Sequence, residues 1–357
     1  MTTDPKNQKI LIFDTAKHHG IGQNLYEEMK KSQVDVSYLD AEKLKKKLFY
    51  KIRRSIFKKI RSFSKQKWKY YYYSKLDRSV EKLFCDIQPK IVLFTSYFHK
   101  YLDRKLLIKL KKCLGFKLYL IDVDSGFKAS SHEAFADYLK YEIQLCDRVF
   151  SFSKRISTLM NNMGYKNVQF FPYGAAIVKL ESLPKIHDIF FVGTPDIRRH
   201  ILLEKLKHHN LTVQGKAWGE YKSSLSNELQ NKIITENIYG DQLRKKLQQT
   251  KIILNINVAA WHTLETGVNL RVFETLALRG FLLTDYCEEL NDLFAVGQEL
   301  EAFKSAEELV DKVSFYLQHD DLREKIARKG HDKFLKYYTW EKRTAELLKS
   351  MRNGSNF

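Results

Sequence analysis

The segment NLRVFETLALRGFLLTD, from Asn269 to Asp285, decides the fold of this chain. It opens with a polar residue, carries Arg271 and Glu274 three residues apart, and continues with mostly apolar residues at helical spacing. This spacing predicts a helix with Gly280 at the left-handed position after its last turn, and the following FLLTDY predicts a short buried strand. A helix that leads directly into a buried strand is typical of α/β domains with a parallel sheet.

The same alternation of apolar strands and amphipathic helices occurs twice along the sequence. The first series extends from KILIFDTA (9–16) to NVQFFPYG (167–174), and the second begins with HDIFFVGT (187–194). Residues 305–351 predict helix nearly throughout, with breaks at His319 and Gly330. Because 357 residues suffice for two cores of ordinary size, we expect two Rossmann-like domains. The predicted parts are a first domain at 1–174, a linker at 175–187, a second domain at 188–335 and a C-terminal helix at 336–357.

The net charge of +20 is the one extreme of the composition, and it indicates an anionic partner. Much of the charge lies in segment 43–75, which has 14 lysines and arginines and no acidic residue. Apolar residues recur in this segment at helical spacing, which predicts an amphipathic helix with one apolar stripe. They are Leu48, Ile52, Ile56, Ile60 and Phe63. Three interpretations of this segment stay open. It could lie on an anionic membrane surface with Trp68 and Tyr70 to Tyr73 at the interface, form a nucleic-acid groove, or be a solvated insertion. No nucleic-acid-binding motif accompanies it, which disfavours nucleic acid.

Several other classes of protein are disfavoured by what the sequence lacks. The four cysteines form no Cys-x-x-Cys pair, which argues against a zinc site and a disulfide framework. No apolar stretch approaches the roughly 18 to 20 residues of a membrane span, and the polar start has no signal-peptide core. No Gly-x-Gly-x-x-Gly follows the first strand, which argues against a Rossmann oxidoreductase. We expect a cytoplasmic protein, with peripheral attachment to the inner face of the cytoplasmic membrane as an option.

Arg271 and Glu274 have two explanations. Three residues apart on a helix, they share a face in its first turn, where backbone N–H groups are unpaired and the helix dipole is positive. A nucleotide suits this place, with a phosphate facing Arg271 and ribose hydroxyls donating to the Glu274 carboxylate. The simpler explanation is that the two side chains pair with each other.

The order of motifs around this helix resembles the C-terminal signature of GT-B glycosyltransferases, closest to the CgeB-like, spore-maturation type of the glycosyl transferases group 1-like family. The signature is present as ILNINV (253–258), RVFETLALRG (271–280) and FLLTDY (281–286). Upstream, HDIFFVGTPDIRRHILLEKL is similar to the first strand and helix of that family's donor domain. The resemblance covers about residues 185–349.

The resemblance implies an α/β enzyme of the GT-B fold, with two Rossmann-like domains facing a cleft and a C-terminal helix that returns to the N-terminal domain. Such an enzyme moves a sugar from a nucleotide-diphospho-sugar, UDP- or GDP-linked, to a cell-surface glycan or lipid-linked acceptor without an essential metal or other cofactor. The C-terminal domain binds the donor and the N-terminal domain binds the acceptor. The implied donor-binding residues are Gly193, Thr194, Arg198, Asn255, Asn269, Arg271 and Glu274, with Glu274 on the ribose.

The first half offers candidates for a catalytic base and for an acceptor or phosphate loop. Strand ends suggest Asp122, Asp124 and His132 as the base, although Asp122 could equally be a loop or helix cap. HHGIG (18–22), after the first strand, resembles the glycine loop in which GT-B enzymes admit the acceptor or sense the donor phosphate. The resemblance implies that His19, Gly20 and Gly22 meet the acceptor or the phosphate. The adjacent His18 and His19 point different ways, which argues against a metal pair.

Two questions stay open. Retaining members of the fold carry a Glu-x7-Glu pattern whose first carboxylate would stand at Thr266, so the stereochemistry is undecided. The rival class is a non-catalytic protein that binds a nucleotide sugar or a membrane surface on a degenerate GT-B scaffold.

Overall fold

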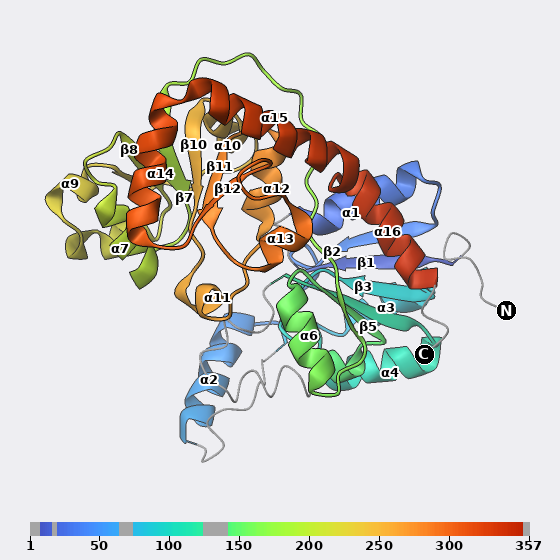
Figure 1. Ribbon diagram of the computed structural model, residues 1–357. Coiled ribbons are helices and arrows are strands. Elements are labelled where there is room, and N and C mark those ends of the chain that lie inside the picture. The colour runs from blue at the N-terminus through green and yellow to red at the C-terminus, as the bar shows by residue number, and fades with distance from the viewer. Residues whose placement is uncertain (1–7, 16–19, 64–73, 124–141, 353–357) are drawn as a thin grey trace. The chain divides into compact units, whose positions relative to one another are not determined.

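The structure, a computed structural model, describes residues 8–15, 20–63, 74–123 and 142–352 (Figure 1). The chain divides into two compact units. The first comprises Met1–Pro172 and Thr344–Phe357, and the second comprises Tyr173–Arg343. Each unit contains one six-stranded sheet with helices between its strands. The expectation of two α/β domains is therefore confirmed.

The first unit has a parallel sheet with the strand order β2-β1-β3-β4-β5-β6. Its strands are β1 (Ile10–Asp14), β2 (Val36–Asp40), β3 (Ile91–Phe94), β4 (Lys117–Asp122), β5 (Arg148–Ser151) and β6 (Val168–Phe170). Its helices are α1 (Ile21–Lys31), α2 (Tyr50–Phe63), α3 (Ser79–Ile87), α4 (Arg104–Leu114), η3 (Ile143–Leu145) and α6 (Lys154–Asn162). All residues of β1 and β3 are buried, as expected for parallel strands covered on both faces.

The second unit has a parallel sheet with the order β12-β11-β10-β7-β8-β9. Its strands are β7 (His187–Val192), β8 (Leu211–Gln214), β9 (Ile233–Ile234), β10 (Thr250–Asn255), β11 (Leu282–Asp285) and β12 (Glu301–Phe303). Numbered within the unit, this is the Rossmann order 3-2-1-4-5-6, which reverses between β7 and β10. Ligands of open α/β sheets bind at the carboxyl ends of the strands beside such a reversal.

Helices connect and cover the strands of the second unit. They are α7 (Ile197–Lys205), α8 (Trp218–Tyr221), η4 (Lys222–Ser224), α9 (Asn227–Gln230), α10 (Gly240–Gln248), α11 (Ala259–Thr263), α12 (Leu270–Ala277), α13 (Glu289–Leu293), α14 (Ala306–Gln318) and α15 (Asp320–Tyr337). Helix α14 packs on β10 and β12, and α15 packs on α12. Buried apolar side chains from both layers, including Phe191, Leu254 and Val313, form the core.

The last helix, α16 (Trp340–Arg352), carries the chain from the second unit back to the first. Near its end, Ser350 accepts hydrogen bonds in the first unit from Arg148 and from Gln169, the latter at 3.4 Å. No helix in the described part of the chain has the length and apolar character needed to cross a bilayer.

Two glycines behave differently from the sequence prediction. Gly330 does not break a helix, because it lies inside α15, and the break comes instead after Tyr337. An added Cβ at Gly330 would collide with the Glu299 carbonyl and lie 2.7 Å from Leu276 Cδ2. Likewise Arg279, with φ 52°, takes the left-handed position after α12 that was predicted for Gly280. Gly280 is required for space, since its Cβ would lie 2.5 Å from Ile253 Cδ1.

Gly330→Ala should therefore destabilise the protein although alanine favours helices by about 1 kcal/mol over glycine. We expect the free energy of unfolding to fall by about 1–3 kcal/mol, since a backbone carbonyl cannot move aside cheaply. Urea unfolding followed by tryptophan fluorescence measures this change. Gly219→Ala is the matched control, because the nearest atom to its added Cβ is 3.7 Å away. Equal effects of the two substitutions would contradict the packing role of Gly330.

Candidate functional site

The predicted donor-binding residues come together at the carboxyl edge of the second sheet. Gly193 and Thr194 directly follow β7, and Asn255 ends β10, the strand paired in parallel with β7. The point where the strand order reverses lies between these two strands. The predicted residues thus lie where this fold places ligands.

An asparagine cluster sets the start of α12. Asn269 is the N-cap, and its Oδ1 accepts a hydrogen bond from the Arg271 N–H at 3.0 Å. Its Nδ2 donates to Asn255 Oδ1 and to Asn257 Oδ1, both at 3.1 Å. Asn255 in turn donates to Thr284 Oγ1 of β11 at 2.9 Å. Asn255 and Asn257 are 5% and 1% exposed, so the start of α12 is fixed by a buried, satisfied polar network.

Gly267 makes this cluster possible. Its φ of 140° lies in the region that favours glycine, and an added Cβ would lie 2.5 Å from Asn257 Cγ. Its carbonyl also accepts the Asn269 N–H at 2.7 Å. The loop before α12 can therefore pass tightly over Asn257 only with glycine at this position.

Arg271 lies in the first turn of α12, as predicted, whereas Glu274, the fifth residue of the helix, lies just beyond that turn. Arg271 Nη1 is 2.7 Å from Glu274 Oε2, and the two side chains are 20% and 35% exposed. The simpler of the two sequence explanations, mutual pairing, is therefore what the structure shows. The opposite face of the helix is buried through Val272, Phe273 and Leu276. Burial of that face aims the charged pair away from the core at the carboxyl edge of the sheet.

Arg198 is engaged within the protein. Its guanidinium forms a two-pronged ion pair with the Asp285 carboxylate, with Nη1 2.6 Å from Oδ2. Asp285 ends β11, is 1% exposed, and also accepts the Asn257 N–H at 2.6 Å. Arg198 thus ties the start of α7 to the ends of β10 and β11. Its predicted contact with a diphosphate stays a prediction, and the structure gives Arg198 a structural role besides.

Arg199 closes the loop after β7. Its Nε donates to the Ile256 carbonyl at 2.9 Å, and its Nη1 donates to the carbonyl and hydroxyl of Thr194 at 2.9 and 3.2 Å. Burial lowers the pKa of Arg199 to about 10, so the group stays cationic at neutral pH. A side chain at Gly193 would be crowded, since a Cβ would lie 3.0 Å from the Phe191 ring.

The candidates in the first unit have different outcomes. Asp122 ends β4 and is buried, whereas Asp124, His132 and His19 lie outside the described residues. Gly20 caps α1 in the left-handed conformation with φ 66°. Gly22 lets the first turn of α1 approach Asp14, because a Cβ there would lie 2.6 Å from the Asp14 carboxyl carbon. Gly22 therefore has a packing role, and its contact with acceptor or phosphate stays a prediction.

Asp14, at the end of β1, is a further buried acid of the first unit. It accepts hydrogen bonds from Thr95 Oγ1 and Tyr38 Oη, both at 2.6 Å. Burial, and then the hydrogen bond to Asp14, raise the pKa of the Tyr38 phenol. Asp14 thus joins the end of β1 to the middle of β2 and to the residue that follows β3.

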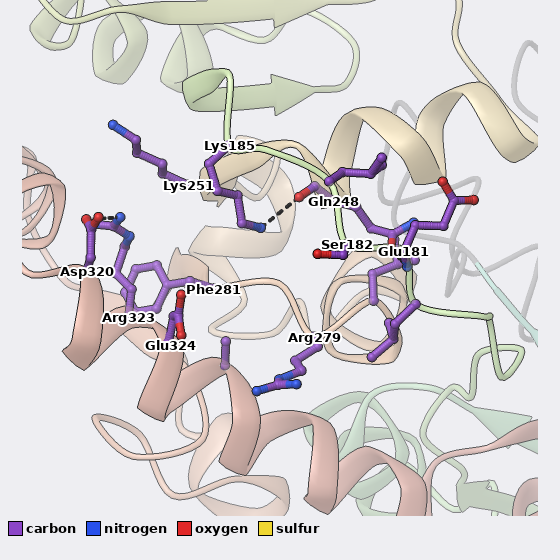
Figure 2. Close-up of a pocket in the computed structure, with 14 residues that line it drawn as sticks. Glu181, Ser182, Lys185, Gln248, Lys251, Arg279, Phe281, Asp320, Arg323 and Glu324 are labelled. Atoms are coloured by element: carbon purple, nitrogen blue, oxygen red, sulfur yellow. Dashed lines mark hydrogen bonds and ion pairs between the residues drawn. The ribbon is translucent and has the colours of Figure 1, made fainter.

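Two cavities lie within the second unit. One of about 330 Å³ lies near the starts of β7, β10 and β11, where Lys185 donates to the Gln248 carbonyl at 2.7 Å and Arg323 pairs with Asp320 (Figure 2). None of the predicted donor-binding residues lines this cavity. The other, of about 340 Å³, lies at the carboxyl edge beside the loop that precedes α12, with Glu265 and Tyr286 in its wall. None of the predicted donor-binding residues lines it either.

Two residues of the site were missed from sequence: Asn257 and Asp285. A usable signal existed for both, since Asn257 lies near the end of the predicted strand KIILNINV (251–258) and Asp285 near the end of FLLTDY (281–286). Polar residues at strand ends lie at the edge that binds ligands.

The Arg198–Asp285 pair can be tested by a double-mutant cycle. Arg198→Met leaves a buried carboxylate without its cation, so we expect the free energy of unfolding to fall by about 3–5 kcal/mol. Asp285→Asn should also destabilise, and the double variant should lose at least about 1 kcal/mol less than the sum of the two. Chemical unfolding of the four proteins gives the coupling. Additive losses would show that the pair does not hold the strand ends together.

The comparisons with known proteins agree with this geometry. Residues 198–349 match a family model described as glycosyl transferase-like, within the region where the sequence resemblance was noted. None of the curated protein sequences compared matches this chain.

Three solved structures illustrate the shared fold. The sucrose-phosphate synthase of Thermosynechococcus elongatus has a TM-score of 0.68 at 10% identity, over 97% of this chain and 98% of that one. HepE of Anabaena, solved with UDP and glucose, has a TM-score of 0.66 at 10% identity, over 97% and 99%. WaaB, a lipopolysaccharide outer core galactosyltransferase, has a TM-score of 0.57 at 11% identity, over 96% and 100%. At these identities the likeness establishes the GT-B fold. The chain therefore has the GT-B fold, and its residues 198–349 form a glycosyl transferase-like domain.

Proposed function

We propose that the protein transfers a sugar from a nucleotide-diphospho-sugar to a cell-surface glycan or a lipid-linked acceptor. The observation that carries the proposal is the asparagine-capped start of α12, which presents Arg271 and Glu274 beside the strand-order reversal. The similar HepE structure contains UDP and glucose, which favours UDP over GDP as the donor nucleotide. By the order of its motifs, we place the chain in the CgeB-like, spore-maturation subgroup.

The start of α12 suits the charge that develops during transfer. The bond between the anomeric carbon and the diphosphate oxygen breaks, and its electron pair leaves with the nucleoside diphosphate. The positive end of α12 and the Arg271 guanidinium would stabilise that leaving group, and Glu274 would accept hydrogen bonds from the ribose. To do so, the Arg271–Glu274 pair would open toward the ligand. We propose that this stabilisation replaces a metal ion.

The acceptor is assigned to the first unit. An acceptor hydroxyl forms the new bond to the anomeric carbon and gives its proton to a base, for which Asp122, Asp124 and His132 are the candidates. The loop with His19, Gly20 and Gly22 would meet the acceptor or the phosphate. WaaB acts on the outer core of lipopolysaccharide, which favours a membrane-linked glycan as the acceptor class. We also propose that the enzyme works in the cytoplasm at the inner face of the membrane.

One observation favours the rival, non-catalytic class. Thr266, which stands where retaining enzymes carry a carboxylate, is buried and donates to Glu289 at 2.8 Å. It cannot supply a nucleophile or a negative charge to the sugar. Measurement of UDP release from UDP-sugars distinguishes the classes, because a protein that only binds would release none.

Nucleotide binding is tested by thermal shift with UDP, UDP-glucose and GDP. A ligand at about 100 times its Kd stabilises the folded protein by about 2.7 kcal/mol. We expect UDP ligands to raise Tm, and Glu274→Gln to reduce that rise because a neutral amide offers the ribose hydroxyls one weaker acceptor oxygen in place of two.

Glu307→Gln is the matched control for this test. Glu307 is an exposed acid in the first turn of α14, another helix of the same unit, so this variant should respond to UDP like the parent. No stabilisation by any nucleotide would refute the donor site. A rise in Tm of Glu274→Gln equal to that of the parent would show that the nucleotide does not bind at α12.

Metal independence is tested with the same UDP-release assay. Because Arg271 and the start of α12 would supply the positive charge, a millimolar excess of EDTA should leave the rate within about twofold of the untreated value. Loss of activity with EDTA and its recovery with Mg²⁺ or Mn²⁺ would contradict this part of the proposal.

A further inference from the structure

Helix α2 and the residues before it expose an apolar surface. Leu48, Phe49, Ile52 and Ile56 are 71%, 63%, 59% and 52% exposed. Ile52 and Ile56 are four residues apart in α2 (Tyr50–Phe63), so they lie on one face of the helix, and Phe49 directly precedes the helix. Exposing neighbouring large apolar side chains to water does not stabilise a folded domain. These four residues, with Lys51 and Arg53, are called the α2 surface below.

Cations flank the apolar side chains of the α2 surface. Lys51 and Arg53 are both exposed and lie about 100° to either side of Ile52 around the helix axis. No acidic residue occurs between Lys43 and Lys75 to neutralise them. An apolar stripe bordered by cations is the arrangement of helices that lie in the plane of an anionic bilayer surface.

The segment before α2 is held firmly to the first unit. Lys46 forms an antiparallel bridge with Leu76, which is 3% exposed. The Lys47 N–H donates to the Lys75 carbonyl at 2.9 Å, and Lys47 Nζ donates to Ser74 Oγ at 2.6 Å. The α2 surface is therefore presented from a fixed base.

Phe49 has an unusual backbone. Its φ is 52°, in the left-handed region that bulky residues rarely adopt, and its carbonyl accepts the Arg53 N–H at 3.0 Å in the first turn of α2. This conformation costs free energy, and the ring recovers little of it by packing within the protein, since it is mostly exposed. An external apolar phase would compensate for that cost.

We propose that the α2 surface docks the protein onto an anionic lipid bilayer, with Phe49, Ile52 and Ile56 inserted below the headgroups and Lys51 and Arg53 at the phosphates. The apolar side chains favour a bilayer over nucleic acid, which offers phosphates but no hydrocarbon. A second copy of the chain is disfavoured by its own charge of +20. The purpose of this docking rests on the proposed function, because docking would bring the enzyme to a membrane-linked acceptor. The docking itself does not depend on that function.

The test is co-sedimentation of the full chain with vesicles of phosphatidylcholine alone or with about 40% phosphatidylglycerol. We expect binding to the anionic vesicles only, and a fall of at least tenfold in the partition coefficient between about 50 and 500 mM salt. Ile52→Asn/Ile56→Asn should weaken binding about tenfold or more by removing inserted apolar area. Lys51→Gln/Arg53→Gln should weaken it by about thirtyfold at low salt.

Matched controls distinguish binding through the α2 surface from nonspecific binding through other exposed apolar or cationic side chains. Ile177→Asn/Ile186→Asn replaces two isoleucines that are 63% and 57% exposed outside segment 43–75. Lys325→Gln/Arg328→Gln removes two exposed cations from α15. Both controls should bind vesicles within about twofold of the parent. Unchanged melting curves show that each variant is folded.

Three outcomes would overturn the inference. The first is binding to neutral vesicles as strong as binding to anionic vesicles. The second is a loss of vesicle binding in the control variants equal to that in the α2 variants. The third is salt-sensitive binding to single-stranded RNA without binding to vesicles. The UDP thermal shift is read separately. A protein that responds to UDP but ignores vesicles refutes only the docking, and one that binds vesicles but no nucleotide refutes only the proposed function.

Discussion

The ion pair between Arg198 and Asp285 holds the carboxyl edge of the second sheet in place, and the proposed donor site depends on it. Asp285 fixes the backbone of Asn257 through its N–H, and Asn257 supports the side chain of Asn269. Asn269 then caps the helix that carries Arg271. Burying two charges is costly, so such a pair is retained for the arrangement it enforces more than for net stability. Here the arrangement is the direction of α12.

In both sheets a buried aspartate links neighbouring strands, but its partner residues differ. In each, a buried aspartate at a strand end collects hydrogen bonds from neighbouring strands: Asp285 from Arg198 and Asn257, and Asp14 from Thr95 and Tyr38. The partners of Asp285 include a cation, Arg198, whereas those of Asp14 include two neutral hydroxyls. The charge of Asp285 is therefore neutralised within the ion pair at the edge of the second sheet.

The sequence predicted the fold and much of the candidate site because both depend on local patterns. Apolar strands placed Gly193 and Asn255 at one sheet edge, and helical spacing placed Arg271 beside Glu274. The partner of Arg198 could not be predicted, because Asp285 is far away in sequence and meets it only through the strand order. The prediction that Gly330 breaks a helix was wrong for a related reason. Local propensity marks glycine as a helix break, but contact with the Glu299 carbonyl requires it inside α15.

The first unit is interrupted in sequence, whereas the second is continuous. During synthesis the ribosome therefore completes the second unit before it supplies the end of α16, and domains generally fold as units in the order in which they emerge. Until then, Arg148 and Gln169 lack the partner they find in Ser350. The first unit thus becomes complete last, so a chain cut short within α16 would leave a finished second unit attached to an unfinished first one.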